Sequence, residues 1–150
     1  GKEKFAFEGI PTFAPEHFSL IRNKDTMKRK QFVKGVEQIA QEGAIQIFTE
    51  LGGGMEEIIV GVVGVLQFEV LTYRLKNEYN VDIVSTPLPY QYIRWIKNDQ
   101  VDFKKLNLSS DTKKVQDLKG QYLLLFSNEW GVRWATDKNP DLVLAEFSQN

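Results

Sequence analysis

The chain has 150 residues, 42% of them hydrophobic, which is enough to bury a core without disulfides or metals. Its 19 basic and 20 acidic residues give a formal net charge of -1, which excludes a molecule-wide basic field, so RNA contact would need a local patch. The sequence contains no cysteine and no apolar run of the roughly 18 to 20 residues that a membrane helix needs, so we expect a cytoplasmic protein with no membrane partner.

Residues 4–8 alternate weakly and run into a turn at Gly9, Ile10 and Pro11, which predicts one strand without a partner nearby. The opening Gly-Lys-Glu-Lys does not resemble a natural start. We therefore interpret residues 1–12 as the tail of a preceding β domain in a longer protein.

The first regular pattern predicts a strand followed by a helix. Alternation over 16–22 places Phe18 and Leu20 on one face of the strand and Ile21 on the other. Asp25 can cap a helix over 26–42. Apolar residues recur in this helix at helical spacing, at Phe32, Val36, Ile39 and Ala40.

Two short strands, 44–49 and 57–63, are expected to pair as a hairpin across the loop of Gly52, Gly53 and Gly54. A second helix follows from Gly64 to Asn80, with Arg74 facing water together with Lys76 and Asn77. Its buried stripe comprises Phe68, Leu71, Leu75 and Tyr79. A strand over 81–85 completes the order β-α-β-β-α-β, which predicts an α+β, ferredoxin-like unit at 13–86 with two helices on one face of a four-stranded sheet.

The same order is repeated more faintly over 87–150. The expected elements are a strand at 90–96, a short helix at 101–106, hairpin arms at 113–118 and 121–126, a helix that Asn128 caps, and a strand at 142–147 that closes a second sheet. The pattern leaves open whether the two units form one fused domain or two lobes.

The sequence lacks the residue patterns of a catalytic site or a metal-binding site. His17 is the only histidine, no cysteine is present, and the carboxylates do not follow the spacing of a calcium loop. Gly52–Gly54 is followed by Met-Glu-Glu rather than by the Lys and Ser or Thr of a phosphate-binding loop. We interpret Gly61 and Gly64 as structural glycines. Gly61 would allow close packing of its strand, and Gly64 would allow a tight turn from the strand into the helix. We predict no catalytic residue, no metal and no cofactor in this chain.

One local cluster of positive charge stands out, with Asp25 as its only acid. It comprises Lys24, Lys28, Arg29, Lys30 and Lys34. Cations at the start of a helix oppose the helix dipole, which favours an anionic partner such as RNA phosphate. The alternative is an ordinary solvated helix face. Tyr90, Tyr92 and Trp95 could likewise stack on bases, although packing in a core is the favoured interpretation.

Several ordered blocks resemble one known family. They are Gly9-Ile-Pro-Thr-Phe-Ala-Pro-Glu-His-Phe18, Arg22, Lys24-Asp25, Lys30-Gln-Phe-Val-Lys-Gly35, Gln41-Glu-Gly-Ala44, Gly61-Val-Val-Gly-Val-Leu-Gln-Phe-Glu-Val70 and Arg74-Leu-Lys-Asn-Glu-Tyr-Asn-Val81. Over residues 4–85 the chain resembles bacterial peptide chain release factor 3. Tyr92-Ile-Arg-Trp95 and residues 128–140 fit the same family more loosely.

The resemblance implies a full protein that is a translational GTPase related to elongation factor G, which drives stop-codon-reading release factors off the ribosome. This chain would be its third, C-terminal domain, and residues 1–12 would end the β-barrel domain before it. GTP and Mg would bind in a GTPase domain outside this chain. The implied partners are the small ribosomal subunit, both protein and RNA, and the factor's own GTPase and barrel domains, with no DNA. The alternative is a free-standing RNA-binding or small-ligand regulatory module of the same fold.

Overall fold

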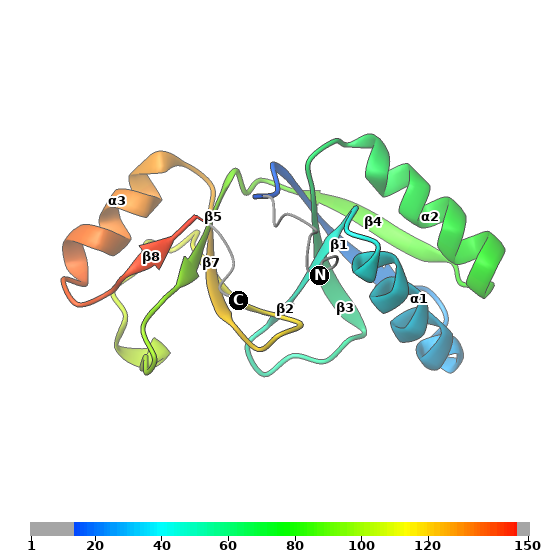
Figure 1. Cartoon of the computed structure of the whole chain (residues 1–150), viewed down its shortest axis with the longest axis horizontal. Coiled ribbons are helices and arrows are strands. Elements are labelled where there is room, and N and C mark those ends of the chain that lie inside the picture. The colour runs from blue at the N-terminus through cyan, green and yellow to red at the C-terminus, as the bar shows by residue number, and fades with distance from the viewer. Residues whose placement is uncertain (1–13, 147–150) are drawn as a thin grey trace, which may run out of the picture.

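The computed structural model describes residues 14–146 (Figure 1), so the strand predicted at 4–8 and the end of the strand predicted at 142–147 lie outside the described residues. The elements, in chain order, are β1 (His17–Asn23), the 3-10 turn η1 (Thr26–Lys28), α1 (Arg29–Gln41), β2 (Gln46–Glu50), β3 (Glu57–Val62), α2 (Leu66–Tyr79), β4 (Ile83–Leu88), β5 (Tyr92–Ile96), the 3-10 turn η2 (Phe103–Lys105), β6 (Lys113–Asp117), β7 (Tyr122–Phe126), α3 (Glu129–Lys138) and β8 (Leu144–Ala145).

The first unit has the predicted ferredoxin-like arrangement. Its strands are antiparallel and lie in the order β4-β1-β3-β2. Both helices begin and end close to where the apolar stripes predict, and Asn80 ends α2 in the left-handed conformation. β4 runs past the predicted end and includes Pro87. Proline is tolerated there because β4 is an edge strand, whose outer backbone groups need no partner strand.

The second unit repeats this strand order. β8, β5, β7 and β6 lie side by side as β4, β1, β3 and β2 do in the first unit, so the faint repeat in the sequence is a real repeat of topology. The helix predicted at 101–106 is wrong in extent, because only η2 forms there. Asp102 caps that single turn by accepting a hydrogen bond from the amide of Lys104.

The prediction of a separate second sheet is wrong. β2 pairs antiparallel with β6, from Phe48 opposite Asp117 to Glu50 opposite Val115, and this pairing joins the two units into one eight-stranded sheet. An unpaired β2 or β6 would leave a row of backbone donors and acceptors without partners. Each strand supplies the partner that the other lacks.

The sheet curves strongly around an apolar cluster. In a flat sheet, the five strand spacings between β1 and β5 would hold them about 24 Å apart. The rings of Phe18, on β1, and Tyr90, just before β5, are nevertheless only 6.4 Å apart. The inner cluster comprises Phe18, Phe48, Ile59, Ile93, Trp95, Val115, Leu123 and Leu125. Strands of both units therefore share one core.

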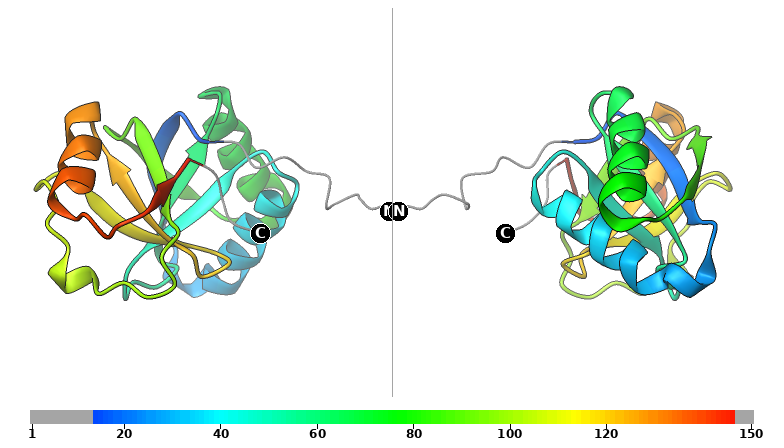
Figure 2. Two further views of the ribbon diagram at one scale, coloured as in Figure 1. Left: turned by 60° about the vertical axis from the view of Figure 1, so that its left-hand side comes forward. Right: turned by 90° about the vertical axis from the view of Figure 1, so that its right-hand side faces the viewer.

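Helices cover the outer face of the curved sheet at its two ends (Figures 1 and 2). At one end, α1 and α2 enclose a second cluster in which Phe32, Val36, Leu71 and Leu75 are fully buried. At the other end, α3 packs against β7, where Ala135 lies over Leu124 and Phe126. Residues of β1 that were predicted to face opposite ways do so, since Ile21 belongs to the helix-covered cluster and Phe18 to the inner one.

Glycines allow two close contacts. A Cβ added to Gly35, on α1, would lie 2.7 Å from Cδ2 of Leu75, so this glycine lets α1 approach α2. A Cβ at Gly61 would lie 2.7 Å from Cβ of Pro15, which confirms the close packing expected there. Gly64 lies in the short turn from β3 to α2, as predicted, but the turn does not require a glycine, because its φ is not positive and an added Cβ would meet nothing within 4 Å.

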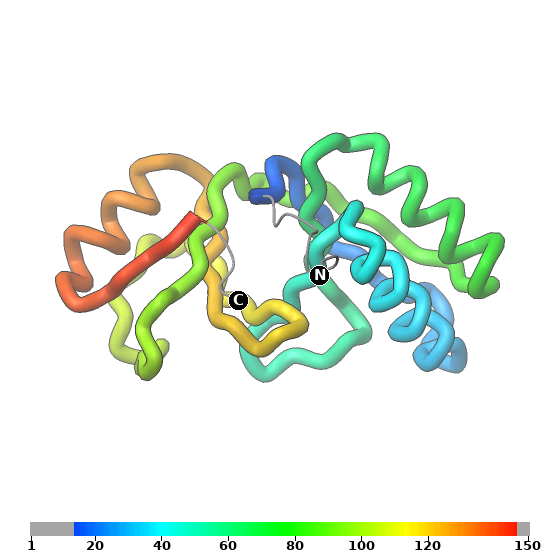
Figure 3. Tube along the Cα trace, viewed as in Figure 1, coloured from blue at the N-terminus to red at the C-terminus, as the bar shows by residue number. Residues whose placement is uncertain are grey.

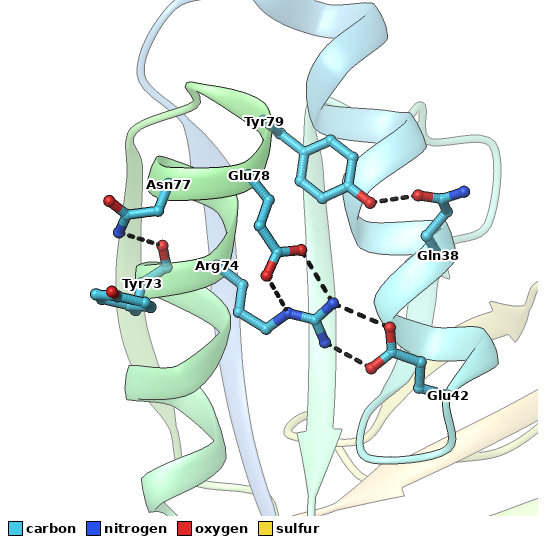
Figure 4. Close-up of polar contacts among 7 residues, drawn as sticks. All are labelled: Gln38, Glu42, Tyr73, Arg74, Asn77, Glu78 and Tyr79. Carbon is cyan, nitrogen blue, oxygen red and sulfur yellow. Dashed lines mark hydrogen bonds and ion pairs between the residues drawn. The ribbon is translucent and has the colours of Figure 1, made fainter.

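Arg74 lies on the outer surface of the two helices, as predicted, but its side chain is only 24% exposed and is paired with acids rather than free. Its guanidinium reaches across from α2 to the end of α1, where Nη1 donates to Oε1 of Glu42 at 2.5 Å and Nη2 to Oε2 at 2.9 Å. The same group donates to Glu78 one turn further along α2. Figure 4 shows this double fork beside a hydrogen bond from the Tyr79 hydroxyl to Gln38. These side-chain contacts join the two helices across their outer surface.

Candidate functional site

Two lysines of the predicted basic cluster lie together on one face of α1. Lys30 and Lys34 are one helical turn apart, both are exposed, and both line a shallow groove with Met27 and Glu37. Neither lysine forms an ion pair or hydrogen bond with another residue of the described range 14–146. Like charges at this spacing disfavour a helix. An anionic partner on this face would remove that cost.

Lys28 has an internal role that the sequence did not reveal. Its Nζ donates a hydrogen bond to the backbone oxygen of Asn80 at 2.9 Å. Asn80 is the C-terminal cap of α2, where unpaired carbonyls carry partial negative charge. Lys28 therefore stabilises the C-terminal end of α2. This contact explains why a lysine stands just before α1, where its charge opposes the dipole of that helix.

Arg29 is also paired within the molecule. Its Nε lies 3.1 Å from Oε2 of Glu56, which comes just before β3, and both side chains are more than half exposed. An exposed pair of this kind is weak and exchanges readily with other partners. Arg29 also lines the groove of Lys30 and Lys34, so its outer edge remains available on the same face.

Lys24 lies apart from the groove and lines a different depression, of about 520 Å³, between β1 and the β2–β3 loop. This depression has mixed charge. Arg22 lies 3.9 Å from Glu57, and Lys113 lies 2.6 Å from Glu50. The carboxylates offset the cations here, so the depression has no net preference for an anion.

The aromatic candidates pack in the core, as the favoured interpretation predicted. Trp95 is 1% exposed, and its Nε1 lies 3.4 Å from Oδ2 of Asp117. Tyr90 packs edge-on against Phe18, and burial raises the pKa of its hydroxyl. Tyr92 is partly buried beneath the guanidinium of Arg94, 5.9 Å from its ring centre. Trp95 in particular presents no open ring face for a base.

The described residues offer little to catalysis or metal binding. His17 is exposed at the start of β1, as expected of a surface histidine. Across residues 14–146 no group of three or more His, Cys, Asp or Glu side chains is placed to hold a metal ion. α2, the longest described helix at 14 residues, is too short to cross a membrane, and no other helix in this range could do so.

The chain's glycine-rich loop does not fit a nucleotide phosphate. Gly52–Gly54 connects β2 to β3 rather than a strand to a helix, so the loop does not lead into a helix N-terminus as a phosphate-binding loop does. The carboxylate of Glu56 lies against Gly54. A carboxylate at this position would repel phosphate. A GTP and Mg site is therefore not supported at this loop.

Sequence reasoning missed an apolar row on the outer face of α2. Leu66, Val70 and Tyr73 follow one another at spacings of four and three, and Leu66 and Tyr73 are 66% and 68% exposed. The signal was visible, since α2 also carries its buried stripe on the opposite side and is thus apolar on two faces. A helix with apolar residues on both sides commonly has partners on both sides.

Comparison with known proteins shows close relatives over almost the full length. A family profile described as "Class II release factor RF3, C-terminal domain" matches residues 7–136. Peptide chain release factor 3 of Symbiobacterium thermophilum is 42% identical over 98% of this chain and 28% of that protein. The same factor from Staphylococcus saprophyticus is 45% identical over 96% of this chain and 27% of that protein.

These relatives are much longer than this chain, which spans little more than a quarter of their length. Peptide chain release factor 3 of Streptococcus mutans is a further relative, 44% identical over 97% of this chain and 28% of that protein. The profile match covers most of the chain, including the whole first unit and the greater part of the second. The chain thus belongs to the family of class II release factor RF3 C-terminal domains.

Proposed function

We propose that this chain is the ribosome-contacting C-terminal domain of a translation termination factor. In the full protein, an N-terminal domain would bind and hydrolyse GTP with Mg, and the factor would drive stop-codon-reading release factors from the ribosome. Family membership supports this role, together with the short span of the chain relative to its relatives. The chain itself would not be an enzyme, and the factor would work in the cytoplasm.

The main support for a ribosome contact is the exposed face of α1 around Lys30 and Lys34. Both lysines are exposed and have no anionic partner among residues 14–146, and Met27 beside them is 90% exposed. Ribosomal RNA supplies phosphates, and ribosomal protein supplies apolar contacts. A groove that combines two cations with an open methionine fits a surface made of both.

The fold suits a part that transmits displacement rather than chemistry. We treat residues 13–86 and 87–150 as two units of one body, because they share a sheet and an inner cluster. A body with a continuous core moves as a unit. Motion at a GTPase domain could thus be passed to a ribosomal surface through this domain.

The experiment is ribosome binding by the full-length factor with Lys30→Glu and Lys34→Glu introduced together. We expect at least a several-fold loss of affinity at moderate salt, because two favourable phosphate contacts become repulsive. Lys104→Glu with Lys105→Glu is the matched control, since both lysines are exposed on η2 of the second unit.

Equal loss in both double variants would mean that net charge, and not this groove, controls binding. Unchanged binding of the α1 variant would refute the assignment of the groove. A fluorescent GTP analogue mixed with the 150-residue chain tests the non-enzymatic part of the proposal, and measurable turnover would overturn it.

A further inference from the structure

An apolar stripe crosses the outer face of α2 and the loop before it, on the side away from the core. It comprises Val63, Val65, Leu66, Val70 and Tyr73. Each of these side chains is more than 40% exposed. Single exposed apolar residues are common, but Leu66, Val70 and Tyr73 follow one another at spacings of four and three along one face of α2, and such a row marks a contact surface.

The stripe is unsuited to RNA. It contains no lysine or arginine. Of the two charged residues beside it on α2, Glu69 is an acid, and the guanidinium of Arg74 is already held by Glu42 and Glu78. Phosphate binding depends on cations, which lie instead on α1. The partner of the α2 stripe is therefore an apolar protein surface, chemically distinct from the partner of the groove at Lys30 and Lys34.

The stripe begins where the described chain begins. The amide of Glu16 donates to the backbone oxygen of Val62 at 2.9 Å, and His17 lies opposite Val62 in the β1–β3 pairing. Glu16 and His17 also line a shared surface depression with Val65. In Figures 1 and 3, the blue start of the described chain lies beside the green loop that enters α2. The described part of the chain thus begins beside the end of the stripe.

We propose that the α2 stripe is the surface on which the preceding part of the full-length factor packs. This inference rests on the proposed function, because it requires that the relatives' additional length precede this domain. The family is a C-terminal domain, so that additional length joins the chain at its N-terminal side.

Covalent connection also explains the small size of the stripe. Five exposed side chains are far fewer than the roughly 20 to 30 residues that each partner contributes to a stable independent complex. A tethered neighbour has an effective concentration in the millimolar range and needs much less contact to stay docked. Contacts between domains of one chain are correspondingly smaller. The stripe is adequate for such a neighbour and too small for a lasting dimer.

Hydroxyl-radical footprinting without ribosomes tests the proposal. We expect at least a threefold lower modification of Tyr73 and Leu66 in the free full-length factor than in the 150-residue chain. Trp130 serves as the reference within the same molecules, because it is 60% exposed on α3 at the other end of the sheet. Its modification should be the same in both proteins.

A pair of variants gives the sharper comparison. Val70→Glu places a charge inside the stripe, whereas Thr72→Glu places one on an exposed flank of the same helix. Both replace a β-branched residue, and neither position is buried. In the full-length factor, Val70→Glu should restore the reactivity of Tyr73 to that of the isolated chain, and Thr72→Glu should leave it protected.

Three results would overturn the inference. Equal reactivity of Tyr73 in the chain and the free factor would show that no preceding domain covers it. Protection that appears only when ribosomes are added would assign the stripe to the ribosome. Protection of the isolated chain that rises with its concentration would assign it to a second copy. Because the expected protection needs no ribosome, failure of ribosome binding would count against the proposed function and leave this inference standing.

Discussion

Arg74 and Glu42 face one another across the outer surface of the two packed helices, joined by two parallel hydrogen bonds between guanidinium and carboxylate. This forked geometry fixes direction as well as distance, so it sets how the end of α1 sits against α2. Glu42 is the C-terminal cap residue of α1, and Arg74 lies in the second half of α2. The pair thus holds the two helices together close to the point where α1 ends.

The pairing makes part of the stability dependent on acid. The hydrogen bond from Arg74 holds the pKa of Glu42 below its usual value. A lowered folded-state pKa means that the stabilisation is present above the unfolded glutamate pKa, about 4.3, and is lost as pH falls through the folded-state pKa. Glu42→Gln should therefore lower the melting temperature at pH 7, and the gap to the parent chain should close as the pH falls below about 4.

Glu37→Gln is the control for this experiment. Glu37 lies on the same helix and forms no ion pair with another residue of the described range. Its substitution should change the melting temperature little at any pH. A gap between Glu42→Gln and the parent that stays constant from pH 7 to pH 3 would contradict the role given to the Arg74 pair.

Gly35→Ala should destabilise the chain by about 1–3 kcal/mol, the usual cost of forcing extra volume into a packed contact. The added Cβ would meet the side chains of Leu75 and Tyr79 at less than 3 Å, so α1 and α2 would have to separate. Gly64→Ala is the matched control, because its Cβ would point into open space. That substitution should be neutral or stabilise by up to about 1 kcal/mol. Urea unfolding of both variants measures the difference, and equal effects would refute the close-contact argument.

The shared core predicts that the two units unfold together. All three tryptophans, Trp95, Trp130 and Trp134, lie in the second unit, and Trp95 packs in the inner cluster, so tryptophan fluorescence reports on the second unit and the core that it shares with the first. Ile39 lies in the helix-covered cluster of the first unit. Ile39→Ala should lower the unfolding free energy by about 2–5 kcal/mol. The shift should be the same by fluorescence and by circular dichroism. A fluorescence midpoint that does not move would show that the units unfold independently.

Sequence patterns predicted those elements whose signals are local. The apolar spacing of Phe32, Val36 and Ile39 predicted α1. Asn128 was correctly predicted as the cap of α3, where its side chain accepts a hydrogen bond from the amide of Gly131. Both depend on residues a few positions apart. The helix expected at 101–106 failed because its sequence forms one capped turn and then extends from Leu106.

The contacts that decide the site are distant in sequence, which is why they escaped prediction. Lys28 and Asn80 are 52 positions apart, and Arg74 and Glu42 are 32 apart. From sequence alone, a charged residue is predicted to be exposed to solvent, because its partner is distant in sequence and only the fold brings the two together. Pairing of β2 with β6 is of the same kind, since nothing local in either strand specifies the other. Of the five candidate cations, sequence alone therefore could not separate Lys30 and Lys34 from Lys28 and Arg29.

The salt dependence of ribosome binding can distinguish RNA phosphate from ribosomal protein as the partner of the α1 groove. Each phosphate contact that a lysine makes releases condensed counterions, so removing one lysine should reduce the slope of log affinity against log salt by about 1. For the full-length factor with Lys30→Ala and Lys34→Ala, we expect a slope shallower by about 2 than that of the parent. Lys104→Ala with Lys105→Ala should leave the slope unchanged. If the α1 variant loses affinity equally at every salt concentration, the lysines do not contact phosphate, and the groove binds a protein surface through Met27 and its neighbours instead.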